Sequence, residues 1–263
     1  MNPILINLGF IQIRWYSVLI LVAFVIGYFL VINRCKKKNI NTSTISDMCF
    51  YLVIVCILGA RIYYCLFNLD YYSKNILDIF KIWEGGLAIH GGIIAGIIFL
   101  YFYTKKKKLN LLQLMDIFVP ALVLGQAIGR WGNFFNQEAF GPVTNFSTLD
   151  NLHIPSFIID GMYIEHSYHH PTFFYESLGC LIIFIIVMII RNLKGIKDGI
   201  VTGIYFILYG IIRFLIEGLR QDSLMFFNLK IAQIVSIVML IVGIYLMIRP
   251  YIFTKNKMKY NDK

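Results

Sequence analysis

The sequence predicts an all-α, polytopic membrane protein with about seven transmembrane helices. Hydrophobic residues make up 59% of the chain and charged residues only 14%, whereas a soluble domain usually carries about 25% charged residues. The apolar residues come in blocks long enough to cross a hydrocarbon layer of about 30 Å as helices. Clusters of basic residues directly follow alternate blocks. Because little polar sequence separates the blocks, we expect one transmembrane domain over residues 1–263.

The apolar blocks predict the spans in order, with ends defined to within several residues. They are 16–33, 46–67, 87–104, 112–129, 172–190, 199–216 and 231–248. The segment 130–171, between the fourth and fifth spans, is too long for a tight turn and is rich in His, Asn, Pro and aromatic residues. We expect it to be an extracytoplasmic head region. The first block has no cleavage site after it, which predicts a retained helix rather than a signal peptide.

Basic residues predict the orientation of the spans. Sixteen follow the odd-numbered spans: Arg34, Lys36, Lys37, Lys38, Lys105, Lys106, Lys107, Lys108, Arg191, Lys194, Lys197, Arg249, Lys255, Lys257, Lys259 and Lys263. The opposite loops hold six: Arg14, Lys74, Lys81, Arg130, Arg220 and Lys230. The positive-inside rule places the sixteen in the cytoplasm, so the N-terminus is extracytoplasmic and the C-terminus cytoplasmic. This clustering accounts for the net charge of +10 without nucleic acid as a partner.

Several kinds of site lack their residues in this sequence. The cysteines Cys35, Cys49, Cys56, Cys65 and Cys180 contain no CxxC pair, which favours ordinary packing residues over disulfides or a zinc site. No GxSxG, HExxH or GxxxxGK[ST] motif is present, so a serine hydrolase, a zincin and a P-loop protein are all disfavoured. The cluster His166, His169 and His170 is a weak metal signal, and we expect no metal.

The sixth span carries polar residues where lipid would favour apolar ones. Tyr209, Arg213, Glu217 and Arg220 are spaced by four, four and three residues, so they lie on one helical stripe. A charge at the bilayer centre costs about 2.5–3.5 kcal/mol on insertion scales. Either Arg213 and Glu217 only neutralise each other against a neighbouring helix, or the stripe binds an anionic group near the outer face.

Two further groups of polar residues lie at the same predicted side of the membrane. Gln126, Arg130 and Asn133 share one face of the helix that ends the fourth span. At the start of the third span, His90 stands beside Gly91, and Arg61 is charged within the second span. A lone histidine is as often a packing residue as a ligand. The convergence of these groups favours a functional site.

Six stretches resemble, in order along the chain, the prolipoprotein diacylglyceryl transferase family. The most specific is Gly129-Arg130-Trp131-Gly132-Asn133-Phe134-Phe135-Asn136-Gln137-Glu138, similar to the family signature G-R-x-G-N-F-x-N-x-E. The others are Arg14-Trp15-Tyr16, Gly59-Ala60-Arg61, Gly85-Gly86 with His90-Gly91-Gly92, His170-Pro171-Thr172 with Tyr175-Glu176, and Tyr209-Gly210 with Arg213, Glu217 and Arg220. The sequence departs from the family at Gln137, where glycine is usual.

The resemblance implies transfer of the sn-1,2-diacylglyceryl group from phosphatidylglycerol to the thiol of the lipobox cysteine of a prolipoprotein. A thioether forms, glycerol 1-phosphate leaves, and no metal or organic cofactor takes part. The implied location is the bacterial inner (cytoplasmic) membrane. The polar residues suit this chemistry. The thiol, with a pKa near 8.5, must lose its proton, and fixed arginines stabilise a departing phosphate.

The resemblance also implies roles for individual residues. The catalytic residues would be His90, Arg130, Arg213 and Glu217. Phosphatidylglycerol would be bound by Arg130, Asn133, Glu138, Arg213, Tyr16, Tyr209 and Gly91. Supporting residues would be Arg61, Asn136, His170 and Arg220. Two candidates for thiol activation stay open, because His90 is the natural proton acceptor and a thiolate stabilised by the two arginines would also serve.

The chief alternative is a transporter or channel for an anionic solute, which would use the same arginines to attract charge. Such a protein needs polar groups that continue past mid-membrane to a cytoplasmic gate. The predicted cytoplasmic halves are almost wholly apolar, and no internal repeat is evident. A non-catalytic scaffold would leave the stripe of the sixth span without a purpose. The sequence therefore favours the transferase.

Overall fold

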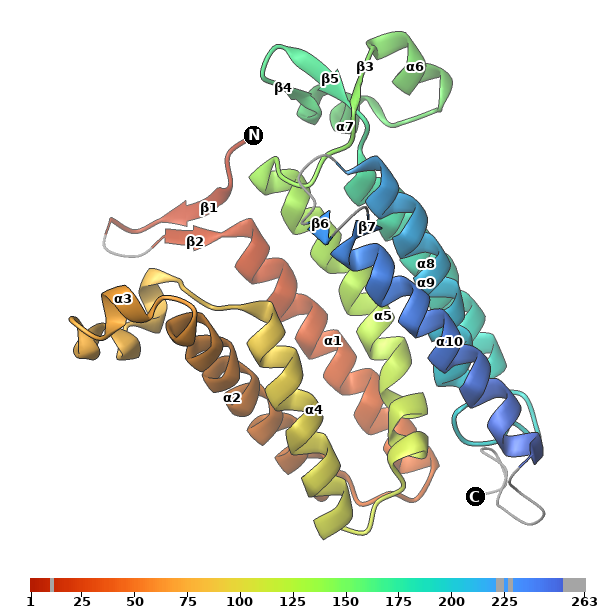
Figure 1. Ribbon diagram of the computed structural model, residues 1–263. Helices are drawn as coiled ribbons and strands as arrows, with labels where there is room; N and C mark the ends of the chain where they lie inside the picture. Colours follow the sequence, from red (N-terminus) through yellow and green to blue (C-terminus); the bar gives the residue numbers. More distant parts are fainter. Residues whose placement is uncertain (10–11, 221–224, 227–228, 253–263) are drawn as a thin grey trace. The chain divides into compact units, whose positions relative to one another are not determined.

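The computed structural model of the protein is mainly helical, with three short antiparallel sheets (Figure 1). It describes residues 1–9, 12–220, 225–226 and 229–252. Contacts between residues divide the chain into two compact units. The larger unit comprises Met1–Arg34 and Met115–Lys263, and the smaller unit is Cys35–Leu114. That the two units form one transmembrane domain stays a prediction.

Long helices coincide with the seven predicted spans. They are α1 (Trp15–Lys37), α2 (Thr42–Leu66), α4 (Ile89–Lys106), α5 (Leu111–Asn136), α8 (Thr172–Ile190), α9 (Ile200–Leu219) and α10 (Ile231–Ile252). Among the described residues, all of these except α4 are long and apolar enough to cross a membrane, which makes six. This confirms a polytopic all-α membrane protein. The 18 residues of α4 include His90, Lys105 and Lys106, so the count of seven spans stays a prediction.

In the larger unit, α8, α9 and α10 lie side by side (Figure 1). A buried apolar cluster joins α5, α8 and α9: Val119, Val123, Ala127, Cys180, Ile183, Val187, Val201, Tyr205 and Tyr209. Helices α9 and α10 approach closely at Gly203 and Gly243. A Cβ added at Gly203 would lie 2.9 Å from the carbonyl oxygen of Gly243. Small residues therefore set the spacing of this helix pair.

Helix α9 is held at both ends by charged side chains. At its N-terminus, the buried carboxylate of Asp116 on α5 accepts hydrogen bonds from the backbone N–H groups of Gly199 (2.7 Å) and Thr202 (2.8 Å). At its C-terminus, the Lys230 ammonium donates to the carbonyl oxygens of Glu217 (2.7 Å) and Gly218 (3.2 Å). Each charge is opposite in sign to the partial charge of the helix dipole at that end, so both contacts stabilise the helix. The helix that carries Arg213 is thereby fixed along its axis.

The predicted head region begins later than expected and is folded. Helix α5 continues past the predicted end at 129 to Asn136, and Gly132 within this extension packs against the Tyr16 ring. The head then forms α6 (Phe146–Asn151), α7 (Ser156–Gly161) and a sheet of β3 (Val143–Thr144), β5 (Ser167–His169) and β4 (Tyr163–Ile164), in the order β3-β5-β4. Its core is Phe134, Leu149, Ile154, Ile158, Ile159, Met162 and Phe173.

Two short hairpins complete the larger unit. Strand β1 (Ile4–Asn7) pairs with β2 (Gln12–Arg14), and β6 (Met225–Phe226) pairs with β7 (Leu229–Lys230), both antiparallel. The sequence did not predict these strands, because they are too short for an alternating hydrophobic pattern.

In the smaller unit, α2 packs against α4. The chain segment that connects α2 to α4 contains α3 (Leu69–Tyr72) and two 3-10 helices, η1 (Ile76–Phe80) and η2 (Ile82–Glu84). The helices touch at Gly59 and Gly91, where a Cβ added to Gly91 would lie 2.3 Å from the Gly59 carbonyl oxygen. Gly91, predicted to bind phosphatidylglycerol, therefore has a clear packing function at this crossing.

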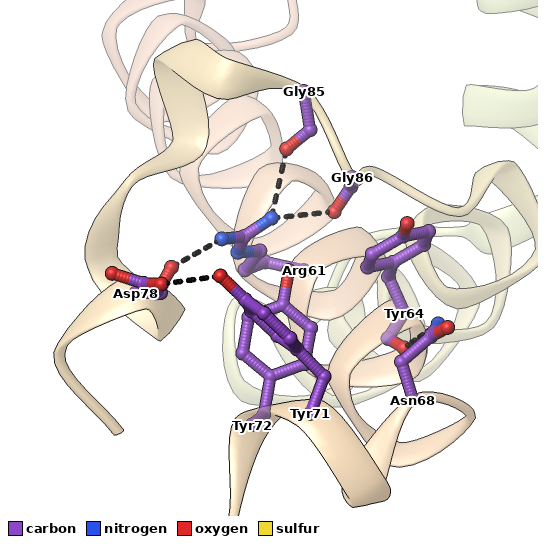
Figure 2. A pocket seen from close by; sticks show the side chains of 8 residues that line it. All are labelled: Arg61, Tyr64, Asn68, Tyr71, Tyr72, Asp78, Gly85 and Gly86. Atoms are coloured by element: carbon purple, nitrogen blue, oxygen red, sulfur yellow. Dashed lines mark hydrogen bonds between the residues drawn. The ribbon is translucent and has the colours of Figure 1, made fainter. Parts of the chain in front are cut away.

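Arg61 organises the segment between α2 and α4. Its guanidinium, on a residue only 5% exposed, donates hydrogen bonds to backbone carbonyl oxygens of this segment (Figure 2). The acceptors are Asp78 (2.5 Å), Ile79 (2.8 Å), Lys81 (3.4 Å), Gly85 (2.8 Å) and Gly86 (3.0 Å). Beside it lies a cavity of about 320 Å³. Hydrogen bonds from Lys81 and Tyr71 lower the pKa of the Asp78 carboxyl at its rim.

This geometry predicts a structural phenotype for Arg61. Arg61→Met is expected to lower the thermal midpoint of the purified protein and to make residues 76–86 sensitive to protease, because the carbonyl oxygens lose their shared donor. Arg61→Lys should restore stability only in part. The matched control is Lys74→Met, which removes an exposed cation from the same segment. Normal protease resistance in Arg61→Met would contradict this role.

Candidate active site

The centre of the polar site is Glu176, in the first half of α8. Its carboxylate, 2% exposed, contacts two arginines from different helices. Oε1 lies 2.8 Å from Nη2 of Arg130 on α5, and Oε2 lies 2.9 Å from Nη1 of Arg213 on α9. The hydroxyl of Tyr209 also donates to Oε1, at 3.1 Å. One carboxylate therefore joins three helices of the larger unit.

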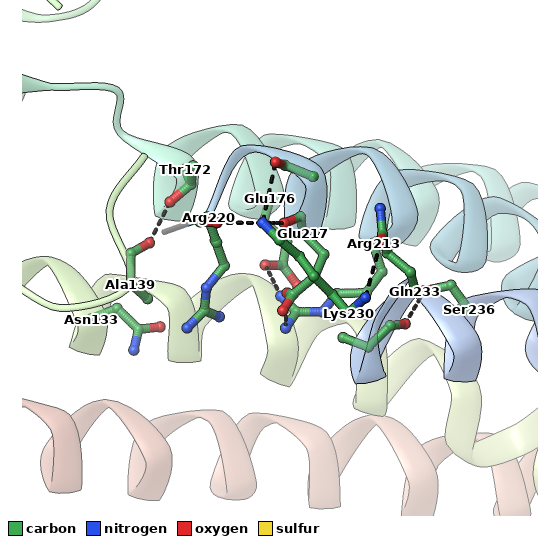
Figure 3. Close-up of polar contacts among 12 residues, drawn as sticks. Asn133, Ala139, Thr172, Glu176, Arg213, Glu217, Arg220, Lys230, Gln233 and Ser236 are labelled. Atoms are coloured by element: carbon green, nitrogen blue, oxygen red, sulfur yellow. Dashed lines mark hydrogen bonds and ion pairs between the residues drawn. The ribbon is translucent and has the colours of Figure 1, made fainter. Parts of the chain in front are cut away.

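Arg213 makes a second ion pair within its own helix. Its Nη2 lies 2.7 Å from Oε2 of Glu217, one helical turn away. The sequence left open a purely neutralising pair or a site for an anion. The pair exists, but Arg213 is also shared with Glu176 (Figure 3). Arg130, Arg213, Glu176 and Glu217 thus form a cluster of two cations and two anions, and the formal charge of this cluster is zero.

Both arginines stay accessible despite these contacts. The side chain of Arg130 is 22% exposed and that of Arg213 is 16% exposed. A guanidinium carries five N–H donors in a planar fork, which matches the oxygens of a carboxylate or of a phosphate. The arrangement can hold an anion between α5 and α9 and stabilise negative charge that develops on it.

A chain of amide and carboxylate groups continues from Arg130 towards the head. Nη1 of Arg130 contacts Oδ1 of Asn133 at 3.5 Å. Nδ2 of Asn133 donates to Oε1 of Glu138 at 2.8 Å, and Nδ2 of Asn136 donates to the same oxygen at 3.3 Å. The structure thus brings together four residues that the sequence predicted for one site.

Gln137 stands where the resembling family usually has glycine, and the backbone explains the preference. Its φ is 51°, in the left-handed region that favours glycine. The side chain contributes contacts that glycine would lack. Its Nε2 donates to the Gly161 carbonyl oxygen at 3.1 Å, and its Oε1 accepts from the N-terminal amine of Met1 at 3.1 Å.

The other predicted residues of the larger unit make separate local contacts. The Tyr16 ring packs on α5 at Gly132, where an added Cβ would lie 2.2 Å from the ring. Nδ1 of His170 lies 3.1 Å from the Tyr175 hydroxyl. Arg220 is the C-cap of α9, and its carbonyl oxygen accepts a hydrogen bond from Lys230.

Three predicted residues belong to the smaller unit. Arg61 uses its donors on backbone carbonyl oxygens, and Gly91 packs against α2. His90 is exposed at the start of α4, with its ring centroid 6.2 Å from that of Tyr63. A place for these three in the active site stays a prediction.

The sequence analysis missed Glu176 as a site residue, although a signal was present. Glu176 is an acidic residue within the span 172–190, so the insertion cost that singled out Arg213 applies equally to it. Asp116, an acidic residue within the predicted span 112–129, carried the same signal and was also missed. Lys230 gave no such signal, because it lies between the sixth and seventh predicted spans.

Metal ligands do not gather in the part of the chain that the structure describes. Within it, no group of three or more His, Cys, Asp or Glu side chains is arranged to hold a metal ion. His169 instead contacts the Gly141 carbonyl oxygen through Nδ1 at 3.0 Å. The five cysteines are free thiols, and Cys56 alone among them is not fully buried.

Comparison with known proteins matches this architecture to one family. Residues 3–249 match the family model of prolipoprotein diacylglyceryl transferase. Relatives from Streptococcus pneumoniae strains JJA and Hungary19A-6 are named phosphatidylglycerol–prolipoprotein diacylglyceryl transferase. Each is 43% identical over 98% of this chain and 99% of the relative. The match confirms the resemblance carried by the six sequence stretches, and the chain belongs to the prolipoprotein diacylglyceryl transferase family.

Proposed function

We propose that this diacylglyceryl transferase moves the sn-1,2-diacylglyceryl group of phosphatidylglycerol to the thiol of a prolipoprotein lipobox cysteine. The observation that carries the proposal is the meeting of Arg130 and Arg213, from separate helices, around one buried position. Two guanidinium groups at low dielectric suit a lipid phosphate. Asn133 contacts Arg130, and Glu138 accepts a hydrogen bond from Asn133, so both side chains are placed to bind the hydroxyl groups of the glycerol head.

The reaction is a displacement at an sp³ carbon. The thiolate sulfur attacks the glycerol carbon that carries the phosphate, and the S–C bond forms as the C–O bond breaks. The phosphate leaves with the head-group glycerol as glycerol 1-phosphate, and the thiol proton passes to a base. Because charge builds up on the departing phosphate, Arg130 and Arg213 would act most strongly in the transition state.

Thiol activation has two sources in this proposal. Histidine exchanges protons readily near neutral pH, which is the sequence argument for His90 as the base. A positive field also stabilises a thiolate. Tyr209 and Tyr16 would line the lipid site, because Tyr209 contacts Glu176 and Tyr16 packs on α5 at Gly132, two residues after Arg130. His170 and Asn136 would support the head side.

The chain is a multi-pass membrane protein, and we infer the bacterial inner membrane with the N-terminus outside. Reporter fusions at Lys37 and Lys107 are expected to report cytoplasm, and one at Asn151 in the head is expected to report the exterior. A third cytoplasmic fusion point, Lys257, lies outside the described residues, as do Lys255, Lys259 and Lys263. A cytoplasmic signal at Asn151 would overturn this orientation.

The function is tested directly with purified protein in phosphatidylglycerol-containing micelles and a synthetic lipobox peptide. Mass spectrometry should show the peptide gaining one diacylglyceryl group, with glycerol 1-phosphate released in equal amount. A peptide with serine in place of the cysteine should stay unmodified. Folded protein that leaves the cysteine peptide unchanged would exclude the transferase, and anion flux into liposomes would then favour the transporter.

A further inference from the structure

The buried carboxylate of Glu176 lies where Arg130 and Arg213 meet, which is the position that the proposed function requires for a phosphate. Its two oxygens contact Nη2 of Arg130 and Nη1 of Arg213 at 2.8 and 2.9 Å. Glu217 contacts Arg213 through a different nitrogen, Nη2. Among the ion pairs within the part of the chain that the structure describes, Glu176 alone contacts both arginines. Carboxylates and phosphates bind guanidinium groups through the same paired N–H donors.

The proposed reaction changes the charge that these arginines must hold. The lipid phosphate is a diester with one negative charge. The departing glycerol 1-phosphate is a monoester with about −1.5 to −2 charges at neutral pH. The two arginines would therefore bind the product more tightly than the substrate, and the product would leave slowly unless another anion replaced it. Without a replacement, Glu217 would be the one anion of this cluster left for two largely buried cations, which is unfavourable.

Glu176 supplies such a replacement. With it, Arg130, Arg213, Glu176 and Glu217 sum to zero formal charge. Its contact with the Tyr209 hydroxyl, at 3.1 Å, gives the carboxylate a partner besides the two arginines. The carboxylate can therefore give up its ion pairs to an arriving phosphate and re-form them as the phosphate departs.

We propose that Glu176 is a built-in counter-anion, which competes with glycerol 1-phosphate for Arg130 and Arg213 and so sets how fast this product leaves. Glu176 acts through the arginines and is a positioning residue rather than a catalytic one. The proposal rests on the proposed function for the identity of the product. The competition between a carboxylate and a phosphate for the two arginines can be measured without turnover.

The test compares wild type with Glu176→Gln in the full-length purified protein, using calorimetric titration with glycerol 1-phosphate and with inorganic phosphate. Removal of one negative charge within contact distance of both cations is expected to lower the Kd for each anion by about tenfold or more. In the transfer assay, one thioether per enzyme should form in a fast burst, followed by slow steady turnover. The control is Glu165→Gln, which removes an exposed carboxylate from the head and should match wild type.

A purely structural brace predicts the opposite direction. If Glu176 only holds the arginines in place, its loss lets them separate, so phosphate binds more weakly and no burst appears. An unchanged or raised Kd in Glu176→Gln therefore overturns the proposal. If this variant does not accumulate, Glu176→Asp carries the test. Its carboxylate keeps the charge but reaches less far towards the two arginines, so Kd should fall in the same direction by less.

Failure of the two proposals is distinguishable. Wild-type protein that binds phosphate but modifies no lipobox peptide would refute the proposed function. The phosphate Kd of Glu176→Gln relative to wild type would then still test whether Glu176 competes with phosphate. Wild-type protein that transfers normally, with a variant Kd at or above its own, would retain the function and refute the counter-anion.

Discussion

Replacing Arg130 by lysine is expected to lower diacylglyceryl transfer by about 10²–10³-fold, although the positive charge is kept. In the structure, Arg130 uses Nη2 on Glu176 and Nη1 towards Asn133. A planar fork can contact Asn133 and direct paired N–H groups at a phosphate that takes the place of Glu176, whereas a lysine ammonium is a compact point charge. The arginine therefore fixes the direction of the phosphate as well as its charge.

The measurement is steady-state transfer to a lipobox peptide at equal membrane abundance. Arg249→Lys, at the end of α10, is the matched control and should retain wild-type activity. The loss in Arg130→Lys should appear in kcat, because the contact strengthens as charge develops on the leaving phosphate. Near-normal kcat with normal abundance would show that a point charge is sufficient at this position.

The second large effect is expected at Arg213 and Glu217. Arg213→Gln should reduce both abundance and activity, because Glu217 loses the cation at 2.7 Å and Glu176 keeps only Arg130. Glu217→Gln should be milder, since Arg213 retains Glu176 at 2.9 Å. The double variant removes one charge of each sign and should recover abundance. Its activity should stay about 10²–10³-fold low, because one phosphate-binding cation is missing.

The experiment is a double-mutant cycle that scores membrane abundance and peptide modification separately. Recovery of both in the double variant would show that Arg213 and Glu217 serve only to neutralise each other. Recovery of membrane abundance without recovery of peptide modification would show that Arg213 contributes to the reaction as well as to stability.

Much of the fold follows from local sequence, and the site does so only in part. Hydropathy and basic clusters predict the spans, because crossing a bilayer depends on each segment separately. The pairing of Arg213 with Glu217 follows from their spacing of one helical turn. The bridge from Glu176 to Arg130 does not, since it joins residues far apart in the chain. Its formation depends on how α5, α8 and α9 pack, which no single-helix pattern encodes.

The same limit applies to the extramembrane segments. Arg61 was expected to support the active site because it is a charge within a span. Its observed partners are carbonyl oxygens of a loop whose path depends on Gly85 and Gly86, both at positive φ. The head was recognised as an insertion, but its three-stranded sheet has strands of two or three residues. Such strands are stabilised by tertiary contacts and carry too few residues for a sequence pattern.

The capping of α9 by Asp116 has a consequence for how the enzyme tolerates different lipids. Transmembrane helices adjust to a change of bilayer thickness by tilting or by shifting along their axes. Asp116 belongs to the helix of Arg130 and binds the first turn of the helix of Arg213, so a relative slide of α5 and α9 would break several buried hydrogen bonds. The two helices must respond to thinning or thickening as one body. We therefore expect the separation of the two arginines to change little with hydrophobic mismatch, so that a phosphate bound between them would keep its geometry as acyl-chain length in the surrounding membrane varies.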